Sequence, residues 1–208
     1  MNEVPAFISN TADDMHCVNA VFRMIAIHLL NKDFTWEEID TLTKAIPGKA
    51  TWTFIGETEF VKMGLKVKNI EPIDYEELHK QGITYLKEIM GRYAYNYTEN
   101  RSNLVSVIQY IPEFIERVEH ETRRASVEEV IGYLREGKLV AAEVNSNLLN
   151  NKPGFNLHFV LLFDFDGEHI ILHDPGLPPI ESRKVTPTEF EACFNYEGAN
   201  GEIAVFSK

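Results

Sequence analysis

Helix-type spacing of apolar residues fills most of the first half of this 208-residue chain, and strand-type patterns fill much of the second half. One helical face is formed by Val18, Val21, Phe22, Ile25 and Leu29, which predicts a helix ending near Leu30. Further helices are predicted at 35–44, 53–63 and 126–137. Strands are predicted at 139–144, 158–164, 168–172 and 202–206. Helices followed by antiparallel strands are typical of the α+β class.

Three further segments complete the predicted layout. Residues 4–8 resemble a short edge strand, because Pro5 stands near its beginning, and residues 65–70 alternate like a strand. Residues 74–122 contain few Gly or Pro after a helix-capping pattern at 74–77. We expect two or three helices there, packed as an insertion over the core. No sharp change in composition separates this segment, so we expect a single domain over 1–208.

The charge balance limits the partners of the protein. The net charge is -12 and the isoelectric point is near 5.0. Nucleic acid phosphates need Lys and Arg as counter-charge, so we expect neither a nucleic acid partner nor an anionic membrane surface. The apolar stretches are far too short for a membrane span. No signal peptide is recognised, which favours a cytoplasmic protein; the oligomeric state stays open.

The two cysteines lie near opposite ends of the sequence. The sequence leaves a disulfide between Cys17 and Cys193 open, but a reducing cytosol favours two thiols. Cys193 lies in an amphipathic helical stretch and is interpreted as a small buried hydrophobe. Cys17 stands at the start of the first predicted helix, where unpaired backbone N–H groups and the helix dipole favour a thiolate.

A histidine and an aspartate follow Cys17 at long range, each on a predicted strand. His158 opens one strand, and Asp174 ends the next. The order Cys, His, Asp is the one that a papain-like cysteine nucleophile uses. The non-catalytic alternative is a buried, inert Cys17 and a structural His158. The neighbouring His16 is a candidate local modulator or metal ligand, and His173 is the competing histidine.

The turn between these two strands decides whether His158 meets Asp174. A three-residue turn at 165–167, with Gly167 in the left-handed conformation, places His158 directly opposite Asp174. The same register places Leu162 opposite Ile170. Directly opposed residues share a face, with Cβ atoms about 4.5–5.5 Å apart. A two-residue turn would shift the register by one and separate the two side chains.

A metal site is the chemical alternative, because Cys17, His158 and Asp174 are all metal-ligand types. The sequence has no C-x-x-C or H-x-x-x-H spacing, so we expect neither a metal nor another cofactor.

Three segments resemble the family related to the bacteriocin-processing cysteine peptidases, which cleave after double-glycine leaders. They are NTADDMHCVNA at 10–20, LHFVLL at 157–162 and IILHDPG at 170–176. The resemblance covers both ends of the chain and not the middle. It implies a papain-like fold with Cys17 as nucleophile, His158 as general base and Asp174 as the residue that orients His158.

The sequence departs from that family in two places. The family has Asp-Cys-Gly at the nucleophile, whereas this chain has His16-Cys17-Val18. The family also places a Gln about six residues before the Cys, where this chain has Thr11 with Asn10 beside it. We expect the side-chain amide of Asn10 to donate to the oxyanion.

The predicted function is a stand-alone cysteine hydrolase, of the peptidase or amidase type, that acts on a peptide or small amide through an acyl-enzyme. A cysteine-dependent acyltransferase uses the same residues. A catalytically weak or inactive binding module is the alternative outside enzymes.

Overall fold

The computed structural model describes residues 3–196 and 201–208, without the side chains at positions 93 and 94. The first part of the chain is helical, except for one strand. Its elements are α1 (Cys17–Ile25), a π-helix (Ala26–Leu30), α2 (Trp36–Thr43), α3 (Phe54–Lys62) and β1 (Lys66–Glu71). The next segment comprises α4 (Tyr75–Gln81), α5 (Ile83–Ile89), α6 (Arg92–Arg101), α7 (Leu104–Val107), a 3-10 turn (Ile108–Tyr110), α8 (Ile111–Arg117) and β2 (Glu119–Thr122).

Strands dominate the last part. It contains α9 (Val127–Arg135), β3 (Leu139–Asn145), α10 (Ser146–Leu149), β4 (Leu157–Phe165), β5 (Ile170–Asp174), β6 (Ile180–Val185), α11 (Pro187–Phe194) and β7 (Ile203–Ser207). The predicted α+β class is confirmed. Several helix starts are also confirmed, because Thr35 and Ser126 form capping boxes with Glu38 and Glu129.

All the strands of the described residues join one seven-stranded sheet in the order β2-β1-β7-β3-β4-β5-β6. Neighbouring strands are antiparallel, apart from the parallel pair of β1 and β2. The C-terminal β7 lies between β1 and β3 and so joins the early part of the chain to the late hairpins. This placement brings residues far apart in sequence into one sheet.

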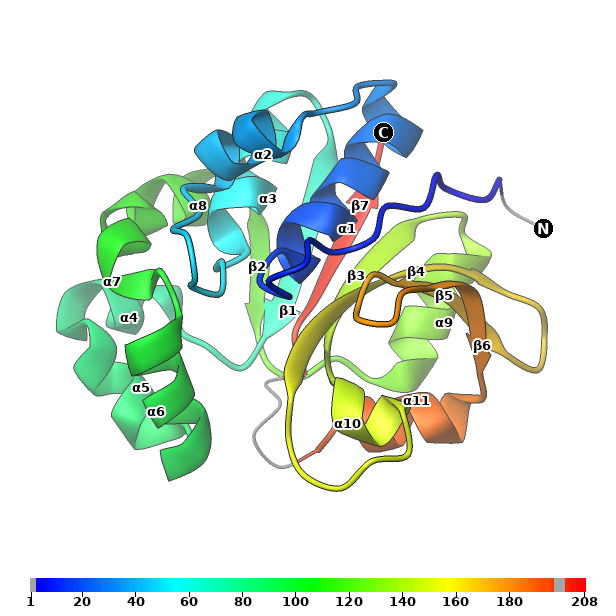
Figure 1. Ribbon diagram of the computed structural model, residues 1–208. Coiled ribbons are helices and arrows are strands. Elements are labelled where there is room, and N and C mark those ends of the chain that lie inside the picture. Colours follow the sequence, from blue (N-terminus) through cyan, green and yellow to red (C-terminus); the bar gives the residue numbers. More distant parts are fainter. Residues whose placement is uncertain (1–2, 197–200) are drawn as a thin grey trace.

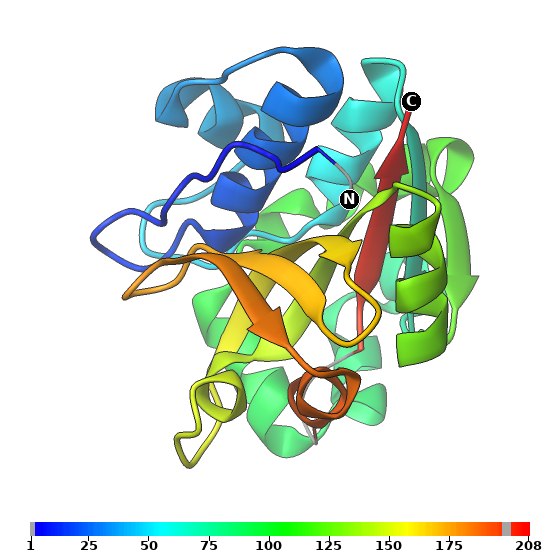
Figure 2. The same ribbon diagram turned by 90° about the vertical axis from the view of Figure 1, so that its right-hand side faces the viewer.

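Helices cover both faces of the sheet (Figures 1 and 2). On one face, α1, α2 and α3 enclose an apolar core that reaches α4 and α8, with Phe22, Phe60 and Phe206 near its centre. On the other face, α9 and α11 enclose a second core. The helices α4 to α7 lie to one side of the sheet in Figure 1. None of the described helices is both long and apolar enough to span a membrane.

The structure differs from the sequence prediction at four segments. Residues 4–8 form no strand; instead the carbonyl oxygen of Pro5 meets Nε2 of His173 at 2.9 Å. The helix α10 and the strand β6 were not predicted. The segment 74–122 holds α4 to α8 instead of two or three helices, and it ends in β2. The division of the chain into one domain with an insertion stays a prediction.

Candidate active site

Cys17 is the first residue of α1, as the sequence predicted. A short turn before the helix fixes this position: the side-chain oxygen of Asn10 accepts hydrogen bonds from the backbone N–H groups of Thr11 (2.9 Å) and His16 (2.8 Å). Asp14 in this turn has a left-handed φ of 58°. The thiol of Cys17 is free and half-buried. Backbone N–H groups at the start of α1 therefore lie where they favour a thiolate.

His158 and Asp174 meet at the ends of neighbouring strands. Nε2 of His158, at the start of β4, lies 2.8 Å from Oδ1 of Asp174, at the end of β5, and both side chains are buried. The same Oδ1 accepts the backbone N–H of Gly176 at 3.0 Å. A Cβ at Gly176 would lie 2.9 Å from this oxygen and 3.2 Å from Nε2 of His158, so the close approach requires glycine.

The expected strand register is wrong, although the two side chains meet. Leu162 pairs with Leu172 rather than with Ile170, and a bulge separates this pair from the pairs nearer the turn. The loop spans 166–169, because Oδ1 of Asp166 accepts the backbone N–H groups of Glu168 and His169. His158 and Asp174 are therefore not directly opposed in the sheet, and their side chains meet across the shifted register.

Cys17 lies on the other side of the His158 ring. Burial lowers the pKa of His158, but hydrogen bonds to Asp174 and Cys17, and the negative charges of these two groups, raise it to about 10. Since Asp174 holds Nε2, the ring nitrogen left for the sulfur is Nδ1. A protonated His158 beside the sulfur stabilises a thiolate. The structure thus brings together the three residues that the sequence selected.

Arg183 is a member of the site that the sequence analysis missed. Its Nη1 lies 3.1 Å from Oδ2 of Asp174 and 2.7 Å from Oδ1 of Asn150, and Nη2 donates to the carbonyl oxygen of Leu149. Burial raises the pKa of Asp174, but the hydrogen bond and charge of His158, the Gly176 N–H and the charge of Arg183 bring it below its usual value. In the sequence, the only indication of the strand that carries Arg183 is the run 180–185. Its polar centre is also typical of a loop.

Asn10 serves the turn before α1. Besides the two hydrogen bonds that its oxygen accepts, its Nδ2 donates to Oδ1 of Asp14 at 2.9 Å. The role of Asn10 as a donor to an oxyanion stays a prediction.

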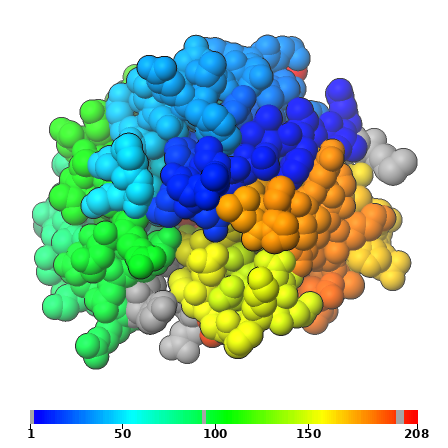
Figure 3. Space-filling view, viewed as in Figure 1, coloured from blue at the N-terminus to red at the C-terminus, as the bar shows by residue number. Residues whose placement is uncertain are grey.

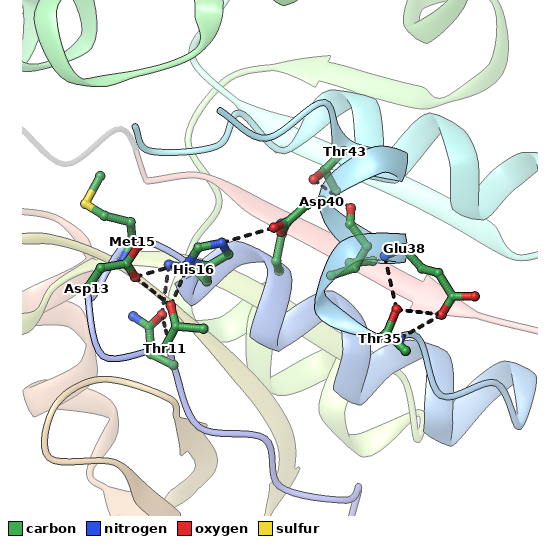
Figure 4. A network of polar contacts seen from close by, with 11 residues as sticks. Thr11, Asp13, Met15, His16, Thr35, Glu38, Asp40 and Thr43 are labelled. Atoms are coloured by element: carbon green, nitrogen blue, oxygen red, sulfur yellow. Dashed lines mark hydrogen bonds and ion pairs between the residues drawn. The ribbon is translucent and has the colours of Figure 1, made fainter. Parts of the chain in front are cut away.

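His16 belongs to a polar network between the start of α1 and α2 (Figure 4). Its Nδ1 lies 2.7 Å from the hydroxyl of Thr11, and its Nε2 lies 3.3 Å from Oδ2 of Asp40. The ring also meets Trp36 edge to face. These contacts fix the residue next to Cys17. In the described parts of the chain, no three His, Cys, Asp or Glu side chains are arranged to hold a metal ion.

The other predicted alternatives have structural partners. The ring of His173 is buried, with Nε2 on the carbonyl oxygen of Pro5 and Nδ1 accepting the backbone N–H of Ser182 at 3.1 Å. Cys193 is a free thiol inside the second core, and burial raises its pKa to about 12. Its interpretation as a buried hydrophobe is confirmed.

A cavity of about 90 Å³ opens beside Cys17 and His158. Trp52, Tyr97 and Phe159 contribute aromatic walls. Figure 3 shows the face on which the N-terminal segment, in blue, meets the segments that carry β4 and α10, in yellow, and β5 and β6, in orange. The loop that contains Asn150 supports Arg183 instead of lining the cavity.

No protein-family model and no curated protein matches the sequence. Several solved structures are similar, and three of them are described below. The peptidase domain of Streptococcus ComA, a bifunctional ABC transporter involved in quorum sensing, has a TM-score of 0.51 and 10% identity over 99% of this chain and 98% of that domain. A double-glycine-motif protease of an AMS/PCAT transporter, solved with its leader peptide, has a TM-score of 0.48 and 14% identity over 99% of this chain and 91% of the other.

The third structure, described as a C39-like peptidase from Bacillus anthracis, has 22% identity and a TM-score of 0.32. That match covers 40% of this chain and 48% of the other, so the chain spans about half of that relative. The full-length match to the ComA domain shows the fold. The chain has a papain-like α+β fold, which it shares with the ComA peptidase domain, and the resemblance is confirmed at the level of the fold.

Proposed function

We propose that this protein is a cysteine hydrolase that cleaves amide bonds in peptides or small amides. One observation carries the proposal: Cys17, at the start of α1, contacts a buried His158 whose far nitrogen is 2.8 Å from Asp174. A thiol, a base and a residue that orients the base are the parts that acyl transfer needs. The cavity beside them offers a place for the substrate. Peptides are the first substrates to test, because the fold is that of peptidase domains.

In the proposed reaction, the thiolate of Cys17 attacks the carbonyl carbon of the scissile amide. Protonated His158 gives its proton to the leaving nitrogen, and the C–N bond breaks to release an amine and leave a thioester on Cys17. Water then attacks the thioester carbon and gives a proton to His158. The C–S bond breaks, the carboxylic acid leaves and the thiolate returns. Asp174 keeps the ring oriented throughout and stabilises its positive charge.

A binding module without turnover is the second candidate. The hydrogen bonds of Asn10 favour a binding module, because the side-chain oxygen and one Nδ2 hydrogen of Asn10 already bond within the turn before α1. Without a preorganised donor at the oxyanion, acyl transfer loses on the order of 10²–10³ in rate.

The two candidates differ in the reactivity of Cys17. We would measure the pH dependence of iodoacetamide alkylation at Cys17 in a Cys193→Ala background, with and without His158→Ala. For a hydrolase, the thiolate titrates well below the free-cysteine pKa of about 8.5, and His158→Ala moves the titration upwards. An unshifted titration in both proteins would leave the binding module as the better candidate.

A further inference from the structure

Three glutamates in, or directly before, three neighbouring strands form a row that ends beside Cys17. Ile203 of β7 pairs with Ile70 of β1 and with Ala142 of β3. The adjacent residues Glu71, Glu202 and Glu143 therefore lie side by side, and the backbone N–H of Glu143 donates to the carbonyl oxygen of Glu202 at 3.1 Å. We call these three residues the acidic row.

The acidic row lies on the sheet face that α1 and α3 cover. Side chains alternate between the two faces of a strand. Ala141 of β3 and Ala204 of β7 belong to the core under α1, so Glu143 and Glu202, two residues away, point to the same side. Glu57 of α3 approaches this face from above, with Nδ2 of Asn69 3.3 Å from its Oε1. The carboxyl group of Glu57 and the three carboxyl groups of the acidic row thus gather between the sheet and the helices α1 and α3.

Glu57, Glu71 and Glu202 are buried, and other carboxyl groups act on the charges of Glu57 and Glu71. Burial and the charge of Glu202 raise the pKa of Glu57 to about 8, and the same causes raise the pKa of Glu71. Burial also raises the pKa of Glu202 to about 7, although Thr53 donates to its Oε1 at 2.6 Å. Within the described residues, Oε2 of Glu57 and Oε2 of Glu71 are buried without a hydrogen-bond partner. Burial and mutual repulsion keep protons on these carboxyl groups, and a cation placed beside them would offset both costs and favour their charged form.

The row reaches the cavity of the candidate active site. Glu143 and Glu202 line this cavity together with Cys17 and His158. The described lining contains a third carboxylate, Asp14, and neither Lys nor Arg. Its remaining walls include large apolar surfaces, namely Trp52, Tyr97, Leu157 and Phe159. The cavity therefore combines an apolar wall with carboxylates.

We propose that this cavity is a specificity pocket for a lysine or arginine side chain of a peptide substrate, with Glu202 as the carboxylate that recognises the cationic group. The apolar stem of such a side chain packs on aromatic walls, while its charged end donates to carboxylates. Trp52 adds a π-face for the cation. The proposal assigns the lysine or arginine to one of the two residues that precede the scissile bond, on the part of the substrate that stays attached to Cys17 in the thioester. The inference rests on the proposed hydrolase function.

The test compares covalent labelling of Cys17 by matched peptidyl chloromethyl ketones. The probes carry lysine or its neutral isostere norleucine, either at the residue that bears the reactive group or at the residue before it. Labelling rates are read by mass spectrometry in the Cys193→Ala background. We expect the lysine probe to react roughly 10-fold faster or more at one position. Equal rates for lysine and norleucine at both positions would overturn the proposal.

Glu202→Gln keeps the size of the side chain and its contact with Thr53, and it should bring the lysine-to-norleucine ratio close to one. Glu168→Gln, at the exposed tip of the β4–β5 hairpin, is the matched control and should leave the ratio unchanged. Where thermal unfolding shows that Glu202→Gln does not fold, Glu143→Gln tests the same pocket. A preference for lysine that survives in a folded pocket variant would contradict the assignment.

The iodoacetamide titration separates this inference from the function on which it rests. If Cys17 is activated but reacts equally with both probes, the hydrolase proposal stands and the specificity pocket is rejected. A Cys17 whose titration does not depend on His158 overturns the hydrolase, and the substrate pocket falls with it.

Discussion

The His158–Asp174 pair and the carboxyl groups of Glu57 and Glu71 are all buried, but their neighbours differ. Asp174 lies within hydrogen-bonding distance of His158, the N–H of Gly176 and Arg183. Among the described residues, Glu57 and Glu71 have carboxyl neighbours and one buried oxygen each without a hydrogen-bond partner. In the paired site that His158 and Asp174 form beside Cys17, Asp174 keeps its negative charge at neutral pH, whereas Glu57 and Glu202 exchange protons near neutral pH. Burial alone therefore does not decide the charge of a group, because its neighbours do.

The paired site should lose all activity when its sulfur is removed. Cys17→Ala eliminates the nucleophile and leaves a small side chain at the start of a well-packed helix, so we expect no turnover and a nearly unchanged melting temperature. Turnover by the parent and by the variant is measured with a peptide substrate found by screening. Full turnover in Cys17→Ala would show that another residue is the nucleophile.

Asp174→Asn tests the orientation of His158. Asparagine retains the size of the side chain, but it removes the charge that faces His158 and Arg183. We expect kcat/KM to fall by on the order of 10²–10⁴, and the alkylation titration of Cys17 to move upwards. Asp33→Asn, an exposed carboxylate paired with Arg23, is the control for a lost surface charge. Unchanged kinetics in Asp174→Asn would mean that Asp174 is only structural.

Glu57, which faces the acidic row, predicts an unusual dependence of stability on pH. Glu57 has a pKa of about 8 in the folded protein against an ordinary value of 4.5. The folded state therefore binds more protons between these values, and the free energy of unfolding falls as the pH rises from 4.5 to 8. We expect a loss on the order of a few kcal/mol, measured by urea unfolding.

The raised pKa of His158 acts in the same direction, but only above the ordinary histidine value of 6.5. Between pH 4.5 and 6.5, His120 and His173 act in the opposite direction, because burial lowers their pKa. The contribution of Glu57 is therefore read as the difference between two curves: Glu57→Gln should lose less stability than the parent across this interval, and the exposed control Glu168→Gln should follow the parent. A Glu57→Gln curve parallel to that of the parent would contradict a buried, protonated Glu57.

Gly176→Ala should weaken the paired site by steric contact. The added methyl would lie 2.9 Å from Oδ1 of Asp174, so the loop must shift. We expect a loss of about 1–3 kcal/mol in stability together with slower alkylation of Cys17. Gly132→Ala, at a helix position with open space around it, is the control and should cost nothing. Equal stability of the two variants would show that the loop adapts freely.

The sequence by itself determined the local elements and the chemistry-bearing residues. Thr35 and Ser126 predicted helix starts correctly, because a capping box is closed by hydrogen bonds within four residues. Cys17 at a helix start was equally local. Cys17, His158 and Asp174 were selected by their order and by their likeness to a family.

Only the tertiary structure decided which distant residues become neighbours. The bulge in β4, the unpredicted β6 that carries Arg183, and the insertion of β7 between β1 and β3 all depend on strand pairing. The acidic row exists because that pairing aligns Glu71, Glu202 and Glu143, which lie far apart along the chain. Pairing energy is shared among many long-range contacts, and no short segment of sequence records it.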